Sequence, residues 1–370
     1  MPQQNTKVEN EVIGELNEEQ RPIFVVGASR SGTALVQSIL NNSNVHLAGE
    51  THYFDDLRVA IGSSSKVLSG ADRRRCEDYF LALTHRPYGH GGDPEKGWMD
   101  RQQLRDYALE LRPDCDAYFE AYCRLVARRA GKRRWGEKTP RHVFRLEELL
   151  TRYPNGQAIC MVRDARAVVA SYRDWRNQGG FDLAADPEHA DKLRREEVRA
   201  RHSYHILIAS LLWCSTVAAA LDAQRRFGEA RVHIQRYEDL VRTPEESVKR
   251  LMAWLGLRFS PQLLEVPLHN SSVFRFDAGR GVTQVAVDSW RSRLNQAEVA
   301  IIESRCRALL AQMGYERTAG RRPLAPYLAA WMTLPFAAAR AMLANRGRIA
   351  NFPAYLYRRL RPISHLRTRM

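Results

Sequence analysis

Three short apolar runs, each followed by a stretch with helical periodicity, dominate the hydrophobic pattern of this 370-residue chain. They occupy residues 23–26, 158–162 and 232–235, and such runs are typical of buried parallel strands. The pattern predicts an α/β fold in three layers, with helices on both faces of a central parallel sheet. Residues that follow the runs should lie together, because the carboxyl ends of parallel strands meet at one edge.

Longer polar and mixed stretches separate the runs. Between the first two, Asp55 to Arg134 is predicted to be a mostly helical insertion, which at the ligand edge of a sheet would shape an acceptor pocket. Asn177 to Arg199 is highly charged and has a glycine pair near its start, which suits either a lid over a substrate or a solvated loop and helix. Ile206 to Trp213 belongs to a buried core helix, because polar residues bracket too short an apolar run for a membrane span.

The first run leads into a glycine-containing loop within Pro22 to Leu40, PIFVVGASRSGTALVQSIL. Gly27 and Gly32 permit conformations in which consecutive N–H groups converge, and the next helix points its positive dipole end at the same place. The spacing is close to G-x-x-x-x-G-K-[ST], but Thr33 stands in the lysine position and the nearby cation is Arg30. The loop therefore predicts an anion site that is not an ordinary ATP loop. A glycine-rich turn of another α/β protein is the alternative.

The second run continues as Ala158 to Trp175, AICMVRDARAVVASYRDW. Arg163 stands at the end of the strand and Ser171 on the following helix, so an arginine and a hydroxyl are placed to hold a second phosphate together. Alone, Arg163 would more simply be a partner of Asp164 at a helix start. The third run leads to Arg236-Tyr237-Glu238-Asp239-Leu240, and a helix with proline and acidic residues in its first turn follows.

These three segments together resemble the sulfotransferases that use 3′-phosphoadenylyl sulfate (PAPS). The family places its loop cation just before Ser-Gly-Thr, and the forms V-R-D-x-R-x-x-x-x-S and R-Y-E-x-L recur in it; the resemblance spans about Pro22 to Tyr315. It implies a P-loop-like fold in which Arg30, Ser31, Gly32, Thr33 and Ala34 bind the 5′-phosphosulfate and Arg163, Ser171 and Tyr237 bind the 3′-phosphate. The family often has a second hydroxyl at the position of Ala34. For Tyr237, a packed aromatic with a satisfied hydroxyl is the alternative.

Within the family the motifs are most similar to the branch that holds protein-tyrosine sulfotransferases and many bacterial enzymes of glycan, lipid and small-molecule sulfation. Val45 to Tyr53, VHLAGETHY, matches the G-E-x-T-like segment of that branch, which implies that Glu50 is the catalytic base. A hydroxyl attacks sulfur better as its proton is removed, and a carboxylate can take that proton. His52 is the competing base, and a surface glutamate is the plainer reading of Glu50.

Trp135 to His142, WGEKTPRH, places Lys138 just before Thr139-Pro140, where proline predicts a turn. The branch has a lysine before a small residue and proline, which implies that Lys138 and Arg30 supply the cations that stabilise the transferring group. A solvated lysine paired with Glu137 is the alternative.

A last segment, Gly279 to Leu294, carries Arg280 ten positions before Trp290. In the tyrosyl-protein branch a basic residue at this offset closes over the nucleotide, which implies the same role for Arg280. A flexible solvated loop explains the segment equally well.

The net charge of +15 is unevenly distributed. Residues 320–370 hold ten arginines and no acidic residue, and they surround the apolar stretch Pro323 to Ala344. Apolar surface flanked by arginine suits the face of an anionic bilayer. Packing back on the domain and a dimer contact are the alternatives. Specific nucleic-acid binding is not expected, because this basic tail lies apart from the phosphate loop.

The remaining composition bears on compartment and cofactors. The six cysteines lack C-x-x-C spacing, which predicts reduced thiols and neither zinc nor a disulfide framework, and residues 1–20 lack the pattern of a signal peptide. We expect a cytoplasmic protein, either free or at the inner face of the membrane. We also expect a flexible segment at 1–20, a sulfotransferase domain at 21–319 and a basic, helical C-terminal segment at 320–370.

The expected reaction moves a sulfuryl group from PAPS, without a metal, to a hydroxyl or amine of a glycan, lipid-linked or small-molecule acceptor. One rival is a P-loop kinase of small molecules, which would need magnesium and a lysine where Thr33 stands. The other is a catalytically inactive, membrane-associated nucleotide-binding protein. The oligomeric state and the acceptor stay open.

Overall fold

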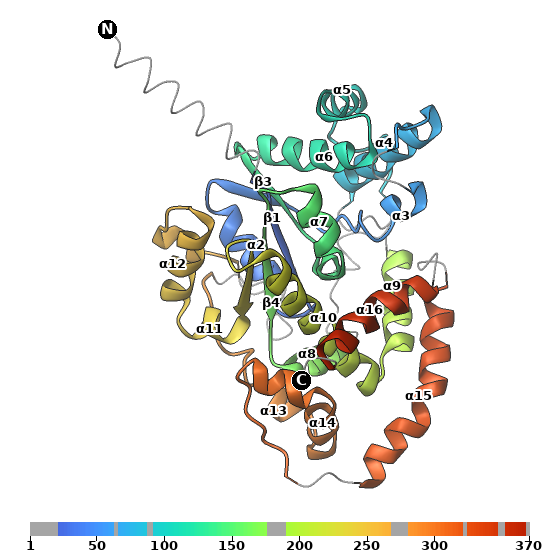
Figure 1. Cartoon of the computed structure of the whole chain (residues 1–370), viewed down its shortest axis with the longest axis vertical. Coiled ribbons are helices and arrows are strands. Elements are labelled where there is room, and N and C mark those ends of the chain that lie inside the picture. Colours follow the sequence, from blue (N-terminus) through green and yellow to red (C-terminus); the bar gives the residue numbers. More distant parts are fainter. Residues whose placement is uncertain are drawn as a thin grey trace.

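The computed structural model describes residues 21–62, 66–86, 92–175, 190–267, 280–320, 324–346 and 352–367. At its centre lies a five-stranded sheet of order β2-β3-β1-β4-β5, with every pairing parallel (Figure 1). The strands are β1 (Ile23–Gly27), β2 (Val45–Ala48), β3 (Arg134–Lys138), β4 (Gln157–Val162) and β5 (Val232–Arg236). The predicted α/β fold with a central parallel sheet is confirmed.

The hydrophobic pattern predicts β1, β4 and β5 and misses the two strands on the other side of the sheet. β2 has only four residues, and β3 reads RWGEK, yet all five residues of β3 are buried. Arg134 is tolerated there because it donates to the backbone oxygens of Arg21 and Leu255. The prediction that Lys138 lies on a turn is wrong: it is the last residue of β3.

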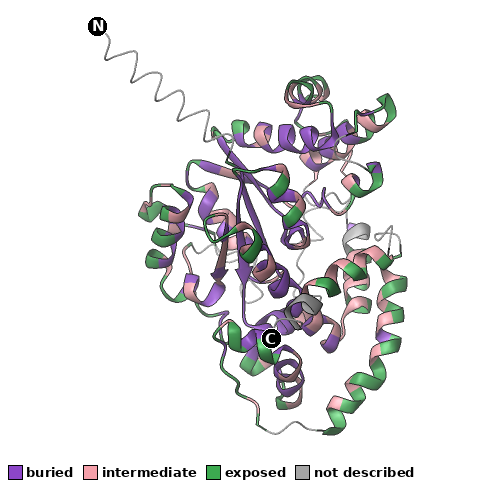
Figure 2. Ribbon diagram, viewed as in Figure 1, coloured by how far each residue is buried: buried purple, intermediate pink, exposed green. Residues whose placement is uncertain are grey.

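Side chains alternate along β1 and bury two faces. Ile23 and Val25 belong to a core layer under α2 (Thr33–Asn41), α11 (Tyr237–Arg242) and α12 (Pro244–Leu255). Phe24 and Val26 belong to the opposite layer, under α6 (Cys115–Arg129), α7 (Leu146–Arg152) and α10 (Ile206–Phe227). Figure 2 shows the sheet buried between these layers. The strands are covered on both faces, which explains why β1, β4 and β5 read as continuous apolar runs.

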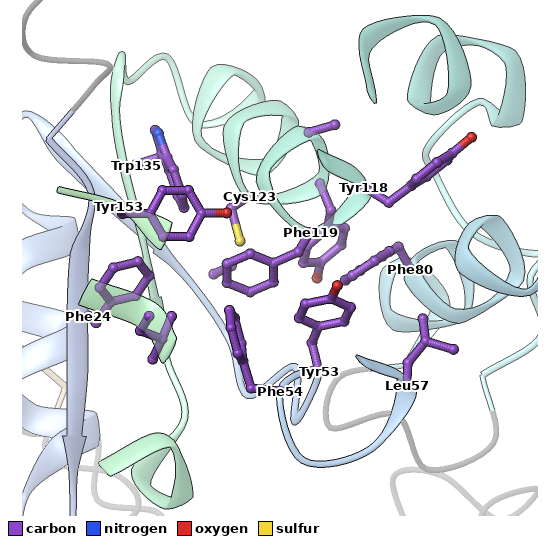
Figure 3. Close-up of a cluster of buried hydrophobic side chains, with 14 of the residues drawn as sticks. Phe24, Tyr53, Phe54, Leu57, Phe80, Tyr118, Phe119, Cys123, Trp135 and Tyr153 are labelled. Atoms are coloured by element: carbon purple, nitrogen blue, oxygen red, sulfur yellow. The ribbon is translucent and has the colours of Figure 1, made fainter. Parts of the chain in front are cut away.

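The stretch between β2 and β3 is helical, as expected. It forms α3 (Leu57–Ile61), α4 (Gly70–His85), α5 (Arg101–Leu111) and α6. Aromatic rings join this insertion to the sheet: Tyr53 stacks on Phe119 with centroids 5.1 Å apart, and Phe119 meets Trp135 of β3 edge-on at 6.3 Å (Figure 3). This packing fixes the loop after β2, which carries Glu50, against the end of β3.

The remaining described α-helices all follow β4 in the chain. They are α8 (Ala165–Trp175), α9 (Ala190–Ser203), α13 (Trp290–Arg293), α14 (Gln296–Gln312), α15 (Leu324–Ala344) and α16 (Phe352–Arg367), with the 3-10 helices η2 (Pro140–Arg145) and η3 (Pro261–Leu264) elsewhere. The glycine pair of the predicted lid lies outside the described residues. All six cysteines are buried, and none forms a disulfide.

Two described helices, α10 and α15, are long and apolar enough to cross a membrane by length and composition. They differ in burial: 72% of the apolar window of α10 is buried but only 6% of that of α15. α10 is therefore the core helix that the sequence predicted. α15 packs along α9 and α10 with most of its surface exposed (Figure 2).

Candidate active site

The candidate active site lies along the carboxyl edge of the sheet, where each strand ends at or near a predicted site residue. Glu50 follows β2 by two residues, Lys138 ends β3, Arg30 lies three residues after β1, Arg163 follows β4 and Tyr237 follows β5. The strand order therefore arranges these residues along the edge as Glu50, Lys138, Arg30, Arg163, Tyr237. Residues from five separate segments become neighbours, as the parallel topology predicts.

The loop between β1 and α2 has the geometry of an anion cradle. Gly27 has φ 140° and Gly32, the N-cap of α2, has φ 91°, both in the region that favours glycine. The Ser31 hydroxyl donates to the Met161 backbone oxygen at 3.2 Å, which fastens the loop to β4. The first N–H groups of α2 have no partner within the helix, so those of Thr33 and Ala34 are available to an anion.

A close contact with Tyr237 leaves no room for a side chain at Gly32. A Cβ there would stand 2.5 Å from Cδ2 of the Tyr237 ring. The same ring lies under the Arg163 guanidinium, whose carbon is 4.4 Å from the ring centroid. Tyr237 is thus a packed aromatic that supports both Arg163 and the loop.

Arg30 and Arg163 approach each other at the centre of the edge. Nε of Arg30 donates to the Ser171 hydroxyl at 3.0 Å, and Nη1 of Arg163 donates to the Arg30 backbone oxygen at 3.2 Å. Arg30 as a residue is half-buried, but burial of its guanidinium lowers its pKa to about 10, and the charge of Arg163 acts in the same direction. Two like charges held together in low dielectric favour the binding of an anion between them.

Arg163 has bonding capacity left. It donates to the backbone oxygens of Arg30 and Ala286, while its buried Nε has no hydrogen-bond partner. The simpler reading, a pair with Asp164, does not apply, because Asp164 pairs with Arg166 at 2.6 Å. A buried guanidinium with an unused N–H is the donor that a phosphate oxygen would satisfy.

The other end of the edge holds an acid–base pair. Nζ of Lys138 donates to Oε1 of Glu50 at 2.7 Å, and Nε2 of His52 lies 3.5 Å from Oε2 of Glu50. The Lys138 side chain is 3% exposed and that of Glu50 21%. The structure therefore brings both candidate bases and the candidate cation into one cluster. Glu50 is neither an isolated surface glutamate nor separated from Lys138.

Glu137, the partner of Lys138 in the alternative interpretation of the sequence, belongs to a separate buried network. Its carboxylate accepts from the Thr51 N–H at 3.1 Å, the Thr51 hydroxyl at 2.9 Å, the Thr139 hydroxyl and Nδ1 of His142 at 3.1 Å. Burial alone would raise the pKa of Glu137, but His142 and these hydrogen bonds lower it overall.

This network ties the segment of Glu50 to that of Lys138, since Thr51 and Thr139 directly follow those two residues. The acid inside the motif WGEKTP is the signal that could have indicated it. We therefore assign Glu137 a positioning role that sequence analysis missed.

Arg280 is not brought to the other site residues. Its side chain is exposed, and its backbone forms an isolated antiparallel bridge with Pro267. Gly279, which precedes it, lies outside the described residues. The segment still touches the site through Ala286, whose backbone oxygen accepts from Arg163. The predicted nucleotide contact of Arg280 stays a prediction.

The assembled edge offers phosphate donors at one end and a carboxylate beside a lysine at the other. Arg30 stands between them. Such an edge suits transfer of an anionic group from a doubly phosphorylated donor to an acceptor that loses a proton. Among the described residues, no group of three or more His, Cys, Asp or Glu side chains is placed to hold a metal ion.

Comparison with known proteins gives a consistent result. The model of a family described as "Sulfotransferase family" matches residues 22–261. Carbohydrate sulfotransferase 2 of Homo sapiens is 28% identical over 166 residues, which cover 42% of this chain and 31% of that protein. Nodulation protein NoeE of Sinorhizobium fredii is 26% identical over 208 residues, 54% of this chain and 48% of that protein. The chain thus matches less than half the length of either relative.

Among solved structures, the sulfotransferase domain from the curacin biosynthetic pathway is similar in fold. The match covers 80% of this chain and 99% of that domain, with a TM-score of 0.50 and 17% sequence identity. At this identity the likeness speaks for the fold alone. It agrees with the parallel sheet and the loop after β1.

Proposed function

The chain belongs to the sulfotransferase family, and we propose that it transfers a sulfuryl group from PAPS to a hydroxyl or amine of an acceptor, releasing adenosine 3′,5′-bisphosphate. The observation that carries the proposal is the order of groups along the sheet edge: anion cradle, paired arginines, then lysine and carboxylate. PAPS supplies the sulfuryl group and carries phosphate groups at both ends of its ribose. The residues present fit such a donor, because Arg163 keeps a buried, unbonded Nε beside the cradle.

The nucleotide is bound by the half of the edge formed by β1, β4 and β5. The N–H groups at the start of α2 and the Arg30 guanidinium bind the 5′ end, where the sulfuryl group is attached. Arg163 and Ser171 bind the 3′-phosphate. The Tyr237 ring, whose centroid lies 4.4 Å from the Arg163 guanidinium carbon, packs against Arg163 and holds it in place. Ser171 also accepts from Arg30, so one hydroxyl links the two phosphate sites.

Acceptor activation takes place at the half formed by β2 and β3. Glu50 removes the proton of the attacking hydroxyl, and Lys138 stabilises the negative charge that shifts onto the leaving phosphate. In the structure the two are ion-paired at 2.7 Å, so Lys138 must exchange Glu50 for an anionic ligand when the donor binds. His52, 3.5 Å from Glu50, is the alternative base.

The acceptor class is supported only coarsely. One relative is a carbohydrate sulfotransferase by name, which favours a glycan, and the exposed tail favours a lipid-linked molecule. Small molecules complete the proposed set. The kinase alternative finds no support in the loop, where Thr33 replaces the lysine.

Labelled-sulfate transfer tests this proposal. Purified protein with ³⁵S-PAPS should label a component of a cell extract, and Lys138→Ala should not. Equal binding of ATP with magnesium and of adenosine 3′,5′-bisphosphate would favour a kinase. Tight binding of the bisphosphate with no label transferred in any extract would favour the inactive binding protein.

We further propose that α15 rests on the anionic inner face of a membrane, which would place the protein in the cytoplasm at that surface. Leu328, Trp331 and Phe336 are 57%, 41% and 79% exposed, and the surrounding tail is rich in arginine without an acidic residue. Apolar side chains and cations side by side suit an acidic bilayer.

Co-sedimentation with vesicles of phosphatidylglycerol tests this contact. Binding should weaken as salt screens the arginines and should fall in the double variant Trp331→Ser/Phe336→Ser. Val285→Ser is the matched control, because Val285 is 57% exposed and lies outside the tail. Vesicle binding that is equal in all three proteins would leave α15 as an interface for another partner.

A further inference from the structure

The last helix, α16, reaches from the tail back to the candidate active site. It packs against α10 (Figure 1), and its residues Leu356, Tyr357 and Leu360 are exposed. On the inner side the guanidinium carbon of Arg359 lies 3.6 Å from the centroid of the Tyr355 ring and 4.7 Å from that of Phe144 in η2. α16 lies beyond residues 22–261, the part of the chain that the family model matches.

Three segments that carry site residues meet at Arg359. Asp55, on the loop of Glu50, attracts the charge of Arg359. Arg141, three residues after Lys138, repels the charge of Arg359. The charges of both Arg30 and Arg359 act on Tyr172, the residue after Ser171: burial raises the pKa of Tyr172, while a hydrogen bond with Ser29 and these two charges oppose the rise. Arg359 therefore lies beside the segments that directly follow Glu50 and Lys138 in the chain.

The Arg359 guanidinium is not satisfied by the groups around it. Its Nε is buried without a hydrogen-bond partner. Asp55, the carboxylate beside it, is shared with Arg141 at 3.4 Å and Arg145 at 3.1 Å. Burial lowers the pKa of Arg359, although Tyr355 and Asp55 act in the opposite direction. A buried cation with an open donor is costly unless a ligand supplies the missing anion.

We propose that Arg359, together with Arg141, binds a phosphate or carboxylate group of the acceptor, so that the acceptor's hydroxyl or amine is presented to Glu50. The planar guanidinium matches both anions, and the rings of Tyr355 and Phe144 lie against it. The inference rests on the proposed sulfotransferase function. It narrows the acceptor to molecules that carry an anionic group as well as a hydroxyl or amine, whether soluble or in a lipid headgroup.

Binding to the nucleotide complex tests the subsite. Protein saturated with adenosine 3′,5′-bisphosphate is titrated calorimetrically with glucose 6-phosphate, glucuronate and glucose, and with vesicles of phosphatidylglycerol or phosphatidylcholine. Arg359→Gln removes the guanidinium that is proposed to bind the anion. Arg359→Lys keeps the positive charge and serves as a check on folding. Arg361→Gln is the matched control, since it removes the same charge from an exposed position of the same helix.

We expect at least one anionic probe to bind about tenfold or more tightly than its neutral counterpart, as for a charge-assisted hydrogen bond. Arg359→Gln should abolish this preference, Arg359→Lys should retain part of it and Arg361→Gln all of it. Preference for the soluble anions indicates a soluble acceptor. Preference for phosphatidylglycerol alone indicates a lipid headgroup only where Arg359→Gln removes it in the Trp331→Ser/Phe336→Ser background, because α15 is expected to bind these vesicles without Arg359.

Equal binding of anionic and neutral probes to the wild type overturns the proposal, as does an equal loss in Arg359→Gln and Arg361→Gln. Nucleotide affinity is the separating readout. It should be unchanged in all variants if only the subsite is wrong, whereas a wild type that does not bind the bisphosphate would refute the sulfotransferase function itself.

Discussion

The two halves of the sheet edge are held in different ways. On the side of β1, β4 and β5, the cations Arg30 and Arg163 are fixed by backbone oxygens, a hydroxyl and an aromatic ring, with no carboxylate between them. On the side of β2 and β3, Lys138 is ion-paired with Glu50, and the buried Glu137 carboxylate is held by hydrogen bonds from His142, Thr51 and Thr139. The first half therefore has positive charge that a bound anion can neutralise. In the second half, Lys138 and Glu50 neutralise each other.

The difference indicates how the two substrates are handled. A half that stores unbalanced positive charge is prepared for a multiply charged nucleotide and should bind it strongly. A half whose charges are paired must rearrange before Glu50 can accept a proton, so its groups should affect turnover more than affinity. Each prediction below either separates the two halves or shows that they act as one.

The largest effect is expected at Glu137, which holds the second half together. Glu137→Ala leaves Thr51, Thr139 and His142 without their shared buried acceptor. Removal of one partner from a buried charged network costs about 3–5 kcal/mol of the free energy of unfolding. Urea unfolding measures it. Glu245→Ala, which loses only an exposed pair with Lys249, should change the unfolding free energy by less than about 1 kcal/mol.

The same residue gives a pH dependence with a defined sign. The pKa of Glu137 is lower in the folded protein than its ordinary value of 4.5. Its stabilising contribution is therefore present above that ordinary value and is lost as pH falls through the folded pKa. Wild-type stability should fall in this acidic window more steeply than that of Glu137→Ala. Parallel curves would show that the network does not depend on the charge.

The next effect is on catalysis. Glu50→Gln should lower turnover by roughly 10²-fold or more, the usual contribution of a general base, and leave the affinity for adenosine 3′,5′-bisphosphate nearly unchanged. Steady-state rates and calorimetry on the same variant measure both. A Glu50→Gln protein with the wild-type rate, beside an inactive His52→Ala, would transfer the role to His52.

A smaller effect is expected at Gly32, in the first half. A Cβ in Gly32→Ala collides with the Tyr237 ring that supports Arg163, so nucleotide affinity should fall by about tenfold, a typical value for one disturbed charge-assisted contact. Gly62→Ala is the control: Gly62 also has positive φ, at 101°, but nothing lies within 4 Å of its added Cβ. Equal affinity losses in the two variants would mean that backbone strain, and not Tyr237, is responsible.

The residues of the first half of the edge could be predicted from sequence because they belong to local motifs. The glycines at 27 and 32 and the arginine directly after β4 keep their spacing whatever surrounds them. β3 was missed because its charged residues are satisfied by partners far along the chain, such as the Leu255 oxygen on Arg134. The hydrophobic periodicity of a sequence does not indicate partners that are distant along the chain.

Long-range contacts also explain what sequence left open at the site. Nothing in the tail singles out Arg359 from its neighbours Arg358 and Arg361; only the packing of α16 turns it toward Asp55 and Tyr172. Glu137 and Glu50 both follow a glycine, and only the fold separates the buried network of Glu137 from the ion pair of Glu50 with Lys138. The sequence therefore indicated Glu50, Lys138, Arg30 and Arg163 from local motifs, but not Glu137 or Arg359, whose positions depend on long-range contacts.

The most direct test of this account is the nucleotide preference of the wild-type protein. Calorimetric titration with adenosine 3′,5′-bisphosphate and with adenosine 5′-phosphate isolates the 3′-phosphate that we assign to Arg163 and Ser171. Charge-assisted hydrogen bonds from a buried guanidinium predict a preference of about tenfold or more for the bisphosphate, which Arg163→Ala should largely remove. Equal affinity of the wild type for the two nucleotides would contradict a binding site with two phosphate positions.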